Sequence, residues 1–126
     1  MGRTIICTDK APQPVGPYSQ AVKLDSDLVF TSGQLGIDPV TGMMAAGIEA
    51  QTRQVMLNLE AVLHAAGGSL DNVLKTTVFL ADMRDFGAMN GVFAGFFKTD
   101  PPARSCIQAA ALPKGGLVEI ECIARV

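Results

Sequence analysis

The alternation of apolar and polar positions divides the first half of the chain into short extended segments followed by a helix. Residues 3–7, 19–24 and 28–33 are short, largely apolar runs bounded by turn-forming residues, which predicts three strands. From about residue 49 to residue 66 the apolar positions recur every three or four residues, as on one buried helix face. A pair of glycines then ends this helix.

The second half of the chain predicts a strand, another helix and two more strands. Residues 72–81 are rich in β-branched and apolar side chains, which is typical of a strand buried on both faces. Asp82 is a candidate N-cap for a helix that two consecutive prolines end. The apolar stripe of that helix consists of Phe86, Met89, Phe93 and Phe97. Residues 104–112 and 117–125 form the last two strands, around a Pro-Lys-Gly-Gly turn.

The resulting order, β-β-β-α-β-α-β-β, predicts the α+β fold class. We expect a single two-layer domain over residues 1–126, with one six-stranded sheet and both helices on the same face of it. The other face of the sheet is then left bare. Because its strands are too apolar to face water, we expect copies of the chain to associate, sheet face to sheet face.

Composition supports the same picture and weakens one class of function. The chain has 126 residues, 48% of them hydrophobic, enough for one compact domain with a hydrophobic core. Its 10 basic and 12 acidic side chains cover the surface thinly, which favours association over the alternative of a monomer with a neutral polar surface. The net charge is −2 and the cations are scattered singly, which disfavours nucleic-acid binding on electrostatic grounds.

The cysteines and the apolar runs bear on the compartment. Cys7, Cys106 and Cys122 are odd in number and form no CxxC, so they predict neither a disulfide framework nor a zinc motif. No window approaches the ~20 apolar residues that a membrane span needs, and the first residues do not resemble a signal peptide. We therefore expect a soluble cytoplasmic protein, with mitochondria as the alternative, and no membrane partner.

The single histidine and the absent motifs exclude several mechanisms. His64 falls about 180° from the apolar stripe of the first helix, so it is expected to face solvent. Ser-His-Asp and Cys-His mechanisms then have no base. No HExxH, GxGxxG or GxxxxGK[ST] motif occurs, so a metal site, a dinucleotide site and a P-loop have no support.

Arg104 and Cys106 are the first pair of candidate functional residues. They lie two residues apart on one predicted strand, so their side chains share a face. An arginine among apolar residues needs an anion, and its fork suits a carboxylate. The alternative is a structural salt bridge to an acid of the protein itself. Cys106 alone is more typical of a small buried hydrophobic residue than of a nucleophile.

Glu119 and Glu121 are the second pair, and they alternate with apolar residues on the last strand. In an apolar cleft a carboxylate has a raised pKa and can relay protons, whereas on a solvated edge it is only a surface acid. If the last two strands form a hairpin, Glu119 faces about Ala110 and Arg104 lies ~20 Å away. Either these strands are not neighbours or a second chain completes the cleft, and the bare sheet face favours the second alternative.

Four segments together resemble one known family. They are GPYSQA at 16–21, TSGQLGIDPVTG at 31–42, PPARSCIQAAALPKGG at 101–116 and LVEIE at 117–121. In this order they are similar to the RidA/YjgF/UK114 family of reactive-intermediate deaminases, nearest to its eukaryotic branch, and the resemblance covers essentially the whole chain. The chain departs from the family in one place: the segment after Phe96-Phe97 is shorter than in many members, and Pro101 stands before Pro-Ala-Arg where they often have a phenylalanine. The wall of the cleft is therefore expected to differ there.

The resemblance implies a chorismate-mutase-like homotrimer with a mixed six-stranded sheet and clefts between subunits. Members of the family hydrolyse enamines and imines such as 2-aminoacrylate and 2-iminopropanoate to ammonia and 2-oxo acids such as pyruvate. They use no cofactor and no metal. The expected activity is therefore that of a 2-iminobutanoate/2-iminopropanoate deaminase.

The resemblance also assigns roles by motif. Arg104 corresponds to the clamp for the substrate carboxylate, and Glu119 to the acid that positions or activates water. Cys106 corresponds to a cleft residue that contacts the ligand through its backbone N–H. The remaining residues of the expected pocket are Tyr18, a candidate proton partner or lid, with Ser32, Gly33 and Asn90. An imine is already electrophilic, so orientation and proton transfer suffice without a histidine.

Three alternative functions stay open at this point. The first is a module that binds small carboxylates or partner proteins without catalysis, although binding alone would need only Arg104. The second is a ribonuclease or translation inhibitor, as proposed for relatives, which the scattered cations oppose. The third is a chorismate mutase, suggested by the fold alone, whose dicarboxylate substrate should require more than one cation.

Overall fold

The strands and helices follow the predicted order, with one addition. The computed structural model describes residues 2–25 and 27–126, so Met1 and Ser26 of the expected 1–126 domain lie outside the description. The strands are β1 (Arg3–Ile6), β2 (Ala21–Leu24), β3 (Leu28–Thr31), β4 (Gln34–Leu35), β5 (Val73–Leu80), β6 (Ala103–Gln108) and β7 (Val118–Arg125). The helices are α1 (Ile48–Ala65) and α2 (Phe86–Phe96), with short 3₁₀ turns at Leu70–Asn72, Met83–Asp85 and Pro113–Gly115.

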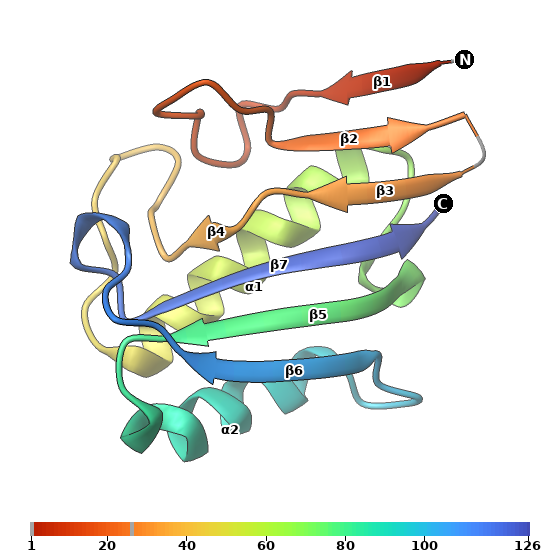
Figure 1. Cartoon of the computed structure of the whole chain (residues 1–126). Helices are drawn as coiled ribbons and strands as arrows, with labels where there is room; N and C mark the ends of the chain where they lie inside the picture. The colour runs from red at the N-terminus through yellow and green to blue at the C-terminus, as the bar shows by residue number, and fades with distance from the viewer. Residues whose placement is uncertain (1, 26) are drawn as a thin grey trace.

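The sheet is open and mixed, and both helices lie behind it in Figure 1. The strand order is β1-β2-β3-β7-β5-β6, with the two-residue β4 added beside β7. Neighbouring strands are antiparallel except β5 and β6, which run parallel. The α+β, two-layer prediction is confirmed, and the expected six strands gain β4 as a seventh.

The last two strands are not neighbours, because β5 lies between β6 and β7. Parallel strands need a crossover rather than a tight turn, and α2 supplies it between β5 and β6. The direct hairpin around Pro-Lys-Gly-Gly is therefore wrong. The predicted strand at 104–112 ends at Gln108, after which the chain crosses the end of β5 to reach β7.

The end of α1 agrees with the sequence prediction, whereas the start of α2 does not. The predicted stop of α1 is confirmed: Gly67 has φ 94°, its N–H donates to the carbonyl of His64, and the N–H of Gly68 donates to that of Leu63. This arrangement satisfies carbonyls that the helix end leaves open. Asp82, however, caps the 3₁₀ turn that follows it by accepting the N–H of Arg84, so α2 begins three residues later than predicted.

The core lies between the sheet and α1, which packs on β7 and against α2. The following side chains of α1, β5 and β7 are at most 1% exposed: Val55, Leu59, Leu63, Val78, Leu80, Val118 and Ile120. Each such burial stabilises the fold by roughly 1.5–3 kcal/mol. Because successive side chains of a strand point to opposite faces, these positions also fix which residues of β5 and β7 face away from the helices.

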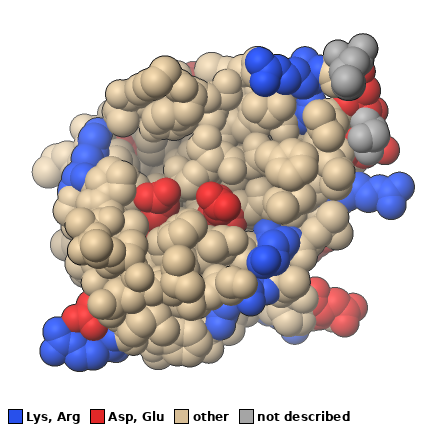
Figure 2. All heavy atoms as spheres, in the orientation of Figure 1, with Lys and Arg blue, Asp and Glu red and all other residues tan. Residues whose placement is uncertain are grey.

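The face of the sheet away from the helices is bare and apolar, as predicted. Ile5, Phe30 and Ile107 are 50%, 42% and 51% exposed, and the cross-strand register places all three on this face. Figure 2 shows it as largely uncharged, with acidic side chains near its middle. No helix among the described residues is long and apolar enough to cross a membrane.

Candidate active site

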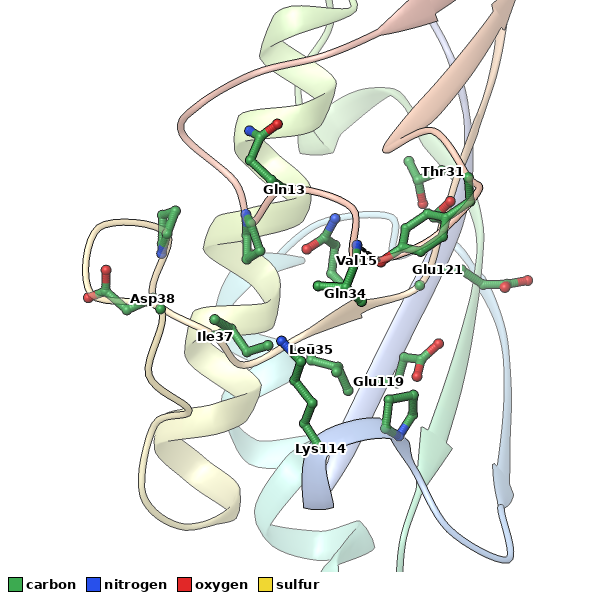
Figure 3. A pocket seen from close by; sticks show the side chains of 17 residues that line it. Gln13, Val15, Thr31, Gln34, Leu35, Ile37, Asp38, Lys114, Glu119 and Glu121 are labelled. Carbon is green, nitrogen blue, oxygen red and sulfur yellow. Dashed lines mark hydrogen bonds between the residues drawn. The ribbon is translucent and has the colours of Figure 1, made fainter.

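The first candidate half-site is a groove on the bare sheet face, with Glu119 in it. Glu119 lies on β7, paired with Leu35 of β4 on one side and with Phe79 of β5 on the other. The groove has a volume of about 760 Å³ and contains four of the predicted site residues: Tyr18, Ser32, Gly33 and Glu119. In Figure 3 Lys114 extends from the turn before β7 toward Leu35, and Glu121 lies at the edge.

A bulge brings Gly33 against Glu119. From Phe30 to Gln34 the chain advances four residues while its partner β7 advances only three, from Ile123 to Ile120. The extra residue bends the chain where β3 ends, as bulges near functional sites commonly do. A Cβ atom at position 33 would overlap the carboxylate of Glu119, so only glycine leaves that carboxylate its observed place.

Three buried amide side chains hold the loops around this groove. Gln20 forms hydrogen bonds with the backbone of residues 8–12, and Asn58 donates to two carbonyls, one in β4 and one just beyond it. Gln51 accepts from the backbone N–H just before β7. All three are at most 5% exposed. The groove wall is therefore fixed by polar side chains that the functional prediction did not include.

The hydroxyl groups of Tyr18 and Ser32 are engaged with neighbouring backbone. Tyr18 accepts the N–H of Val15 at 3.2 Å, which closes the loop of residues 15–18, and both residues line the groove. Ser32 donates to the carbonyl of Ser19 and so joins this loop to the end of β3. Tyr18 is 48% exposed, so its ring remains accessible at the groove mouth.

The surroundings of Glu119 disfavour its ionisation. Burial raises the pKa of this carboxyl above its ordinary value, and the negative charge of Glu121 on the same face raises the pKa further. The expectation that both acids share a face is thus confirmed by register and by their interaction. A carboxyl in this state can exchange a proton near neutral pH more readily than a solvated glutamate.

The second half-site is formed by Arg104 beneath α2. Arg104 on β6 pairs with Thr76 of β5, which is buried on the helix side of the sheet. Its guanidinium lies 4.9 Å from the ring centre of Phe93 and 5.4 Å from that of Phe86, and its Nη1 donates to Oδ1 of Asn90 at 2.7 Å. A cavity of about 380 Å³ adjoins it, with Pro101 in its wall.

Arg104 has no acidic partner within residues 2–25 and 27–126. The ion pair found there joins Arg84 to Asp82 on the surface. The alternative of a structural salt bridge for Arg104 therefore does not hold in the described chain. A half-buried guanidinium with most of its donors free can bind an external anion.

Cys106 shares the face and the neighbourhood of Arg104, as predicted. Burial raises the pKa of its thiol, an effect that the charge of Arg104 only partly opposes, so the thiol stays protonated at neutral pH. Its backbone has a clearer role. The N–H of Ala109 donates to Leu80 of β5, and by the alternation of a strand the N–H of Cys106 points to the free edge of β6.

The two half-sites do not meet within one chain. Glu119 aligns with Phe79 and points away from the helices, whereas Arg104 aligns with Thr76 and points toward them. They line separate cavities on opposite faces of the sheet. His64 is exposed on α1, as predicted, and belongs to neither half-site. No group of three potential metal ligands gathers anywhere in the described part of the chain.

These features define a class of protein: a small two-layer α+β chain with an arginine half-site and a carboxylate half-site on opposite faces of one sheet. The chain belongs to the family described as Endoribonuclease L-PSP, which matches residues 8–126. Its predicted membership of the RidA/YjgF group is thereby confirmed.

Three relatives illustrate the similarity. A mouse protein named 2-iminobutanoate/2-iminopropanoate deaminase is 48% identical over 97% of this chain and 90% of its own. RidA from an Antarctic Psychrobacter is 50% identical, with a TM-score of 0.95 over 98% of this chain and 99% of its own. Escherichia coli TdcF, solved with bound serine, is 44% identical, with a TM-score of 0.94 over 98% of each chain.

Proposed function

We propose that the protein is a 2-iminobutanoate/2-iminopropanoate deaminase whose site is assembled between neighbouring copies in a homotrimer. The observation that carries this proposal is the separation of Arg104 from Glu119 on opposite faces of the sheet. A small imino acid cannot reach both within one chain, whereas the Arg104 edge of one copy can adjoin the bare face of the next. Relatives that carry this activity in their names support the same conclusion.

Imine hydrolysis requires binding of the substrate carboxylate and activation of one water molecule, and each half-site performs one of these tasks. Arg104 binds the substrate carboxylate through parallel N–H donors, and the outward N–H of Cys106 gives a further donor beside it. Glu119 from the neighbouring copy holds a water at the imine carbon and takes its proton as the C–O bond forms. Glu119 passes this proton to the nitrogen of the carbinolamine and takes up the hydroxyl proton as the C–N bond breaks, so that ammonia leaves and a 2-oxo acid remains.

The enamine tautomer needs one additional proton transfer. Protonation of the terminal carbon of 2-aminoacrylate converts it to 2-iminopropanoate, which the same water attacks. Glu119 with its raised pKa and Tyr18 at the groove mouth are the candidate proton donors. The serine found in the TdcF structure is an amino acid of similar size, which supports a site for small α-carboxylates in this chain as well.

The alternatives draw less support from the described geometry. A ribonuclease requires cations along a phosphate backbone, but the groove lining carries three acids, Asp38, Glu119 and Glu121, against the single base Lys114. A chorismate mutase would need more than one cation for its dicarboxylate substrate, whereas the combined lining of the two half-sites, among the described residues, sets Arg104 and Lys114 against the three acids of the groove. A purely binding protein has no need for a partly buried carboxyl with a raised pKa in the groove.

Mixing two inactive variants tests the proposed activity and the shared site together. Arg104→Ala and Glu119→Gln chains, co-expressed or refolded together, should form some sites with an intact Arg104 and an intact Glu119 from different copies. Random assembly gives about a quarter of the wild-type sites. The measurement is pyruvate release from freshly generated 2-aminoacrylate, followed through lactate dehydrogenase.

The two parts of the proposal fail differently in this experiment. If the unmodified protein does not exceed the spontaneous rate, the deaminase activity is wrong. If it is active but the mixture stays as inactive as each variant alone, the site is not shared between copies.

Gly33→Ala is expected to reduce activity with little loss of stability. The backbone at Gly33 does not adopt a positive φ, so alanine fits it, and the Cβ displaces the Glu119 side chain from Cγ outward without meeting backbone among its nearest atoms. Misplacing a catalytic group by about 1 Å can cost on the order of 100-fold in rate. Steady-state kinetics and thermal unfolding of Gly33→Ala would check this, with Gly87→Ala, which meets no atom within 4 Å, as the matched control. A fully active Gly33→Ala enzyme would contradict the placement of Glu119.

A further inference from the structure

The stripe of α2 that faces Arg104 has an unusual composition. Phe86, Asn90 and Phe93 are spaced i, i+4 and i+7, so they lie on one side of the helix, and each contacts the guanidinium. The two rings are 5.4 Å and 4.9 Å from its central carbon, and Asn90 accepts one hydrogen bond between them along the stripe. The sequence prediction placed both phenylalanines only in the hydrophobic stripe of this helix.

The α2 stripe compensates the charge of Arg104 without occupying its N–H donors, which an acidic side chain could not do. A half-buried cation needs compensation, and a carboxylate partner would occupy the same donors that a ligand carboxylate requires. Aromatic rings attract a guanidinium through their electron-rich faces and take up none of its N–H donors. Asn90 is uncharged and accepts from Nη1, so the net positive charge and the remaining donors stay available.

We propose that Phe86 and Phe93 are positioning residues for carboxylate binding: they hold Arg104 in place, charged and with its donors free, where an acidic partner would block it. This inference rests on the proposed function, because it concerns the clamp of that site. It adds that affinity for the carboxylate depends on aromatic character at these positions and not only on their volume.

Phe86 is the better position for a test, since Phe93 is 5% exposed and its truncation would disturb the core. Phe86→Leu should weaken pyruvate binding, measured by calorimetry, and raise KM, each by roughly threefold to tenfold, with kcat nearly unchanged. Phe86→Met should behave like Phe86→Leu, whereas Phe86→Tyr and Phe86→Trp should keep most of the affinity. Phe96→Leu is the matched control, because Phe96 is also a partly buried residue of α2 packed against the core.

The outcomes separate this inference from the function on which it rests. If the unmodified protein binds no pyruvate, the carboxylate clamp is wrong, and this inference falls with it. If the unmodified protein binds pyruvate and Phe86→Leu binds it equally well, only the aromatic positioning is wrong. A loss in Phe86→Leu that Phe96→Leu matches, or that Phe86→Tyr fails to restore, would show that Phe86 acts through packing alone and would equally overturn the inference.

Discussion

Arg104→Ala is expected to lower kcat/KM for 2-iminopropanoate by about 100- to 1,000-fold, because it removes the one charged side chain that the described residues contribute to the cavity on the α2 side. The loss should appear mainly in KM for the carboxylate and partly in kcat, since an unanchored imine is also misaligned with the water. Arg104→Lys should have a kcat/KM between that of the unmodified protein and that of Arg104→Ala, because lysine keeps the charge but lacks the planar fork. The measurement is steady-state hydrolysis at several substrate concentrations.

Arg84→Ala provides the control for charge and location. Arg84 lies just before α2, is 90% exposed in its side chain and pairs only with Asp82. Its removal should leave kcat/KM unchanged, since exposed pairs contribute little. Full activity in Arg104→Ala, or an equal loss in Arg84→Ala, would contradict the assignment of Arg104 as the clamp.

Glu119→Gln is expected to lower kcat by about 100-fold or more, because glutamine can hold a water but cannot accept its proton. KM should change little, since the carboxylate of the substrate is bound by the other half-site. Glu121→Gln is the matched control, a neighbouring acid on the same face and the same strand. Equal losses in both variants would indicate a general effect of charge in the groove and not a specific role for Glu119.

The pH dependence of kcat tests the role of Glu119 in a second way, because the direction of its shift can be predicted. If Glu119 acts as a carboxylate, kcat falls on the acid side with an apparent pKa above that of ordinary glutamate, because burial and Glu121 both raise the pKa. Glu121→Gln removes the second cause, so its acid limb should move to lower pH. If the acid limb of the kcat profile stays at the same pH in Glu121→Gln, the titrating group is not Glu119.

Loss of folding should not complicate the Glu119→Gln result. Folding raises the pKa of Glu119, so this group contributes stability that is fully present below the unfolded pKa and is lost as pH rises through the folded pKa. Near neutral pH the uncharged glutamine lacks that disadvantage. The variant should therefore unfold at a temperature at least as high as that of the unmodified protein.

Local patterns were sufficient to predict most of the elements but not how they join. The spacing on α1 and the glycines after it are short-range signals, and both held. The position of β5 between β6 and β7 is a long-range pairing that no single segment encodes. This pairing could nevertheless have been predicted from the order of elements. A strand, a helix and a strand in succession favour a parallel crossover, which places β6 beside β5 and not beside β7.

The site could be predicted as a set of residues but not as an arrangement. Alternation indicated that Arg104 shares a face with Cys106, yet which face depends on pairing with β5. The buried amides were overlooked for a different reason. Gln51 and Asn58 fall on the apolar side of α1, seven residues apart, and polar groups buried there require partners elsewhere in the fold.

Because β6 is an edge strand, it exposes the protein to aggregation in solution. A strand with one unpaired side is a template on which a foreign strand can grow, and this is how folded chains begin to aggregate. The two prolines at 101 and 102 directly precede β6 and have no N–H to offer, so they cannot extend the ladder toward an intruding chain. The edge strand that carries the arginine therefore stays open to a small ligand, while the prolines limit the pairing of a foreign strand at its beginning.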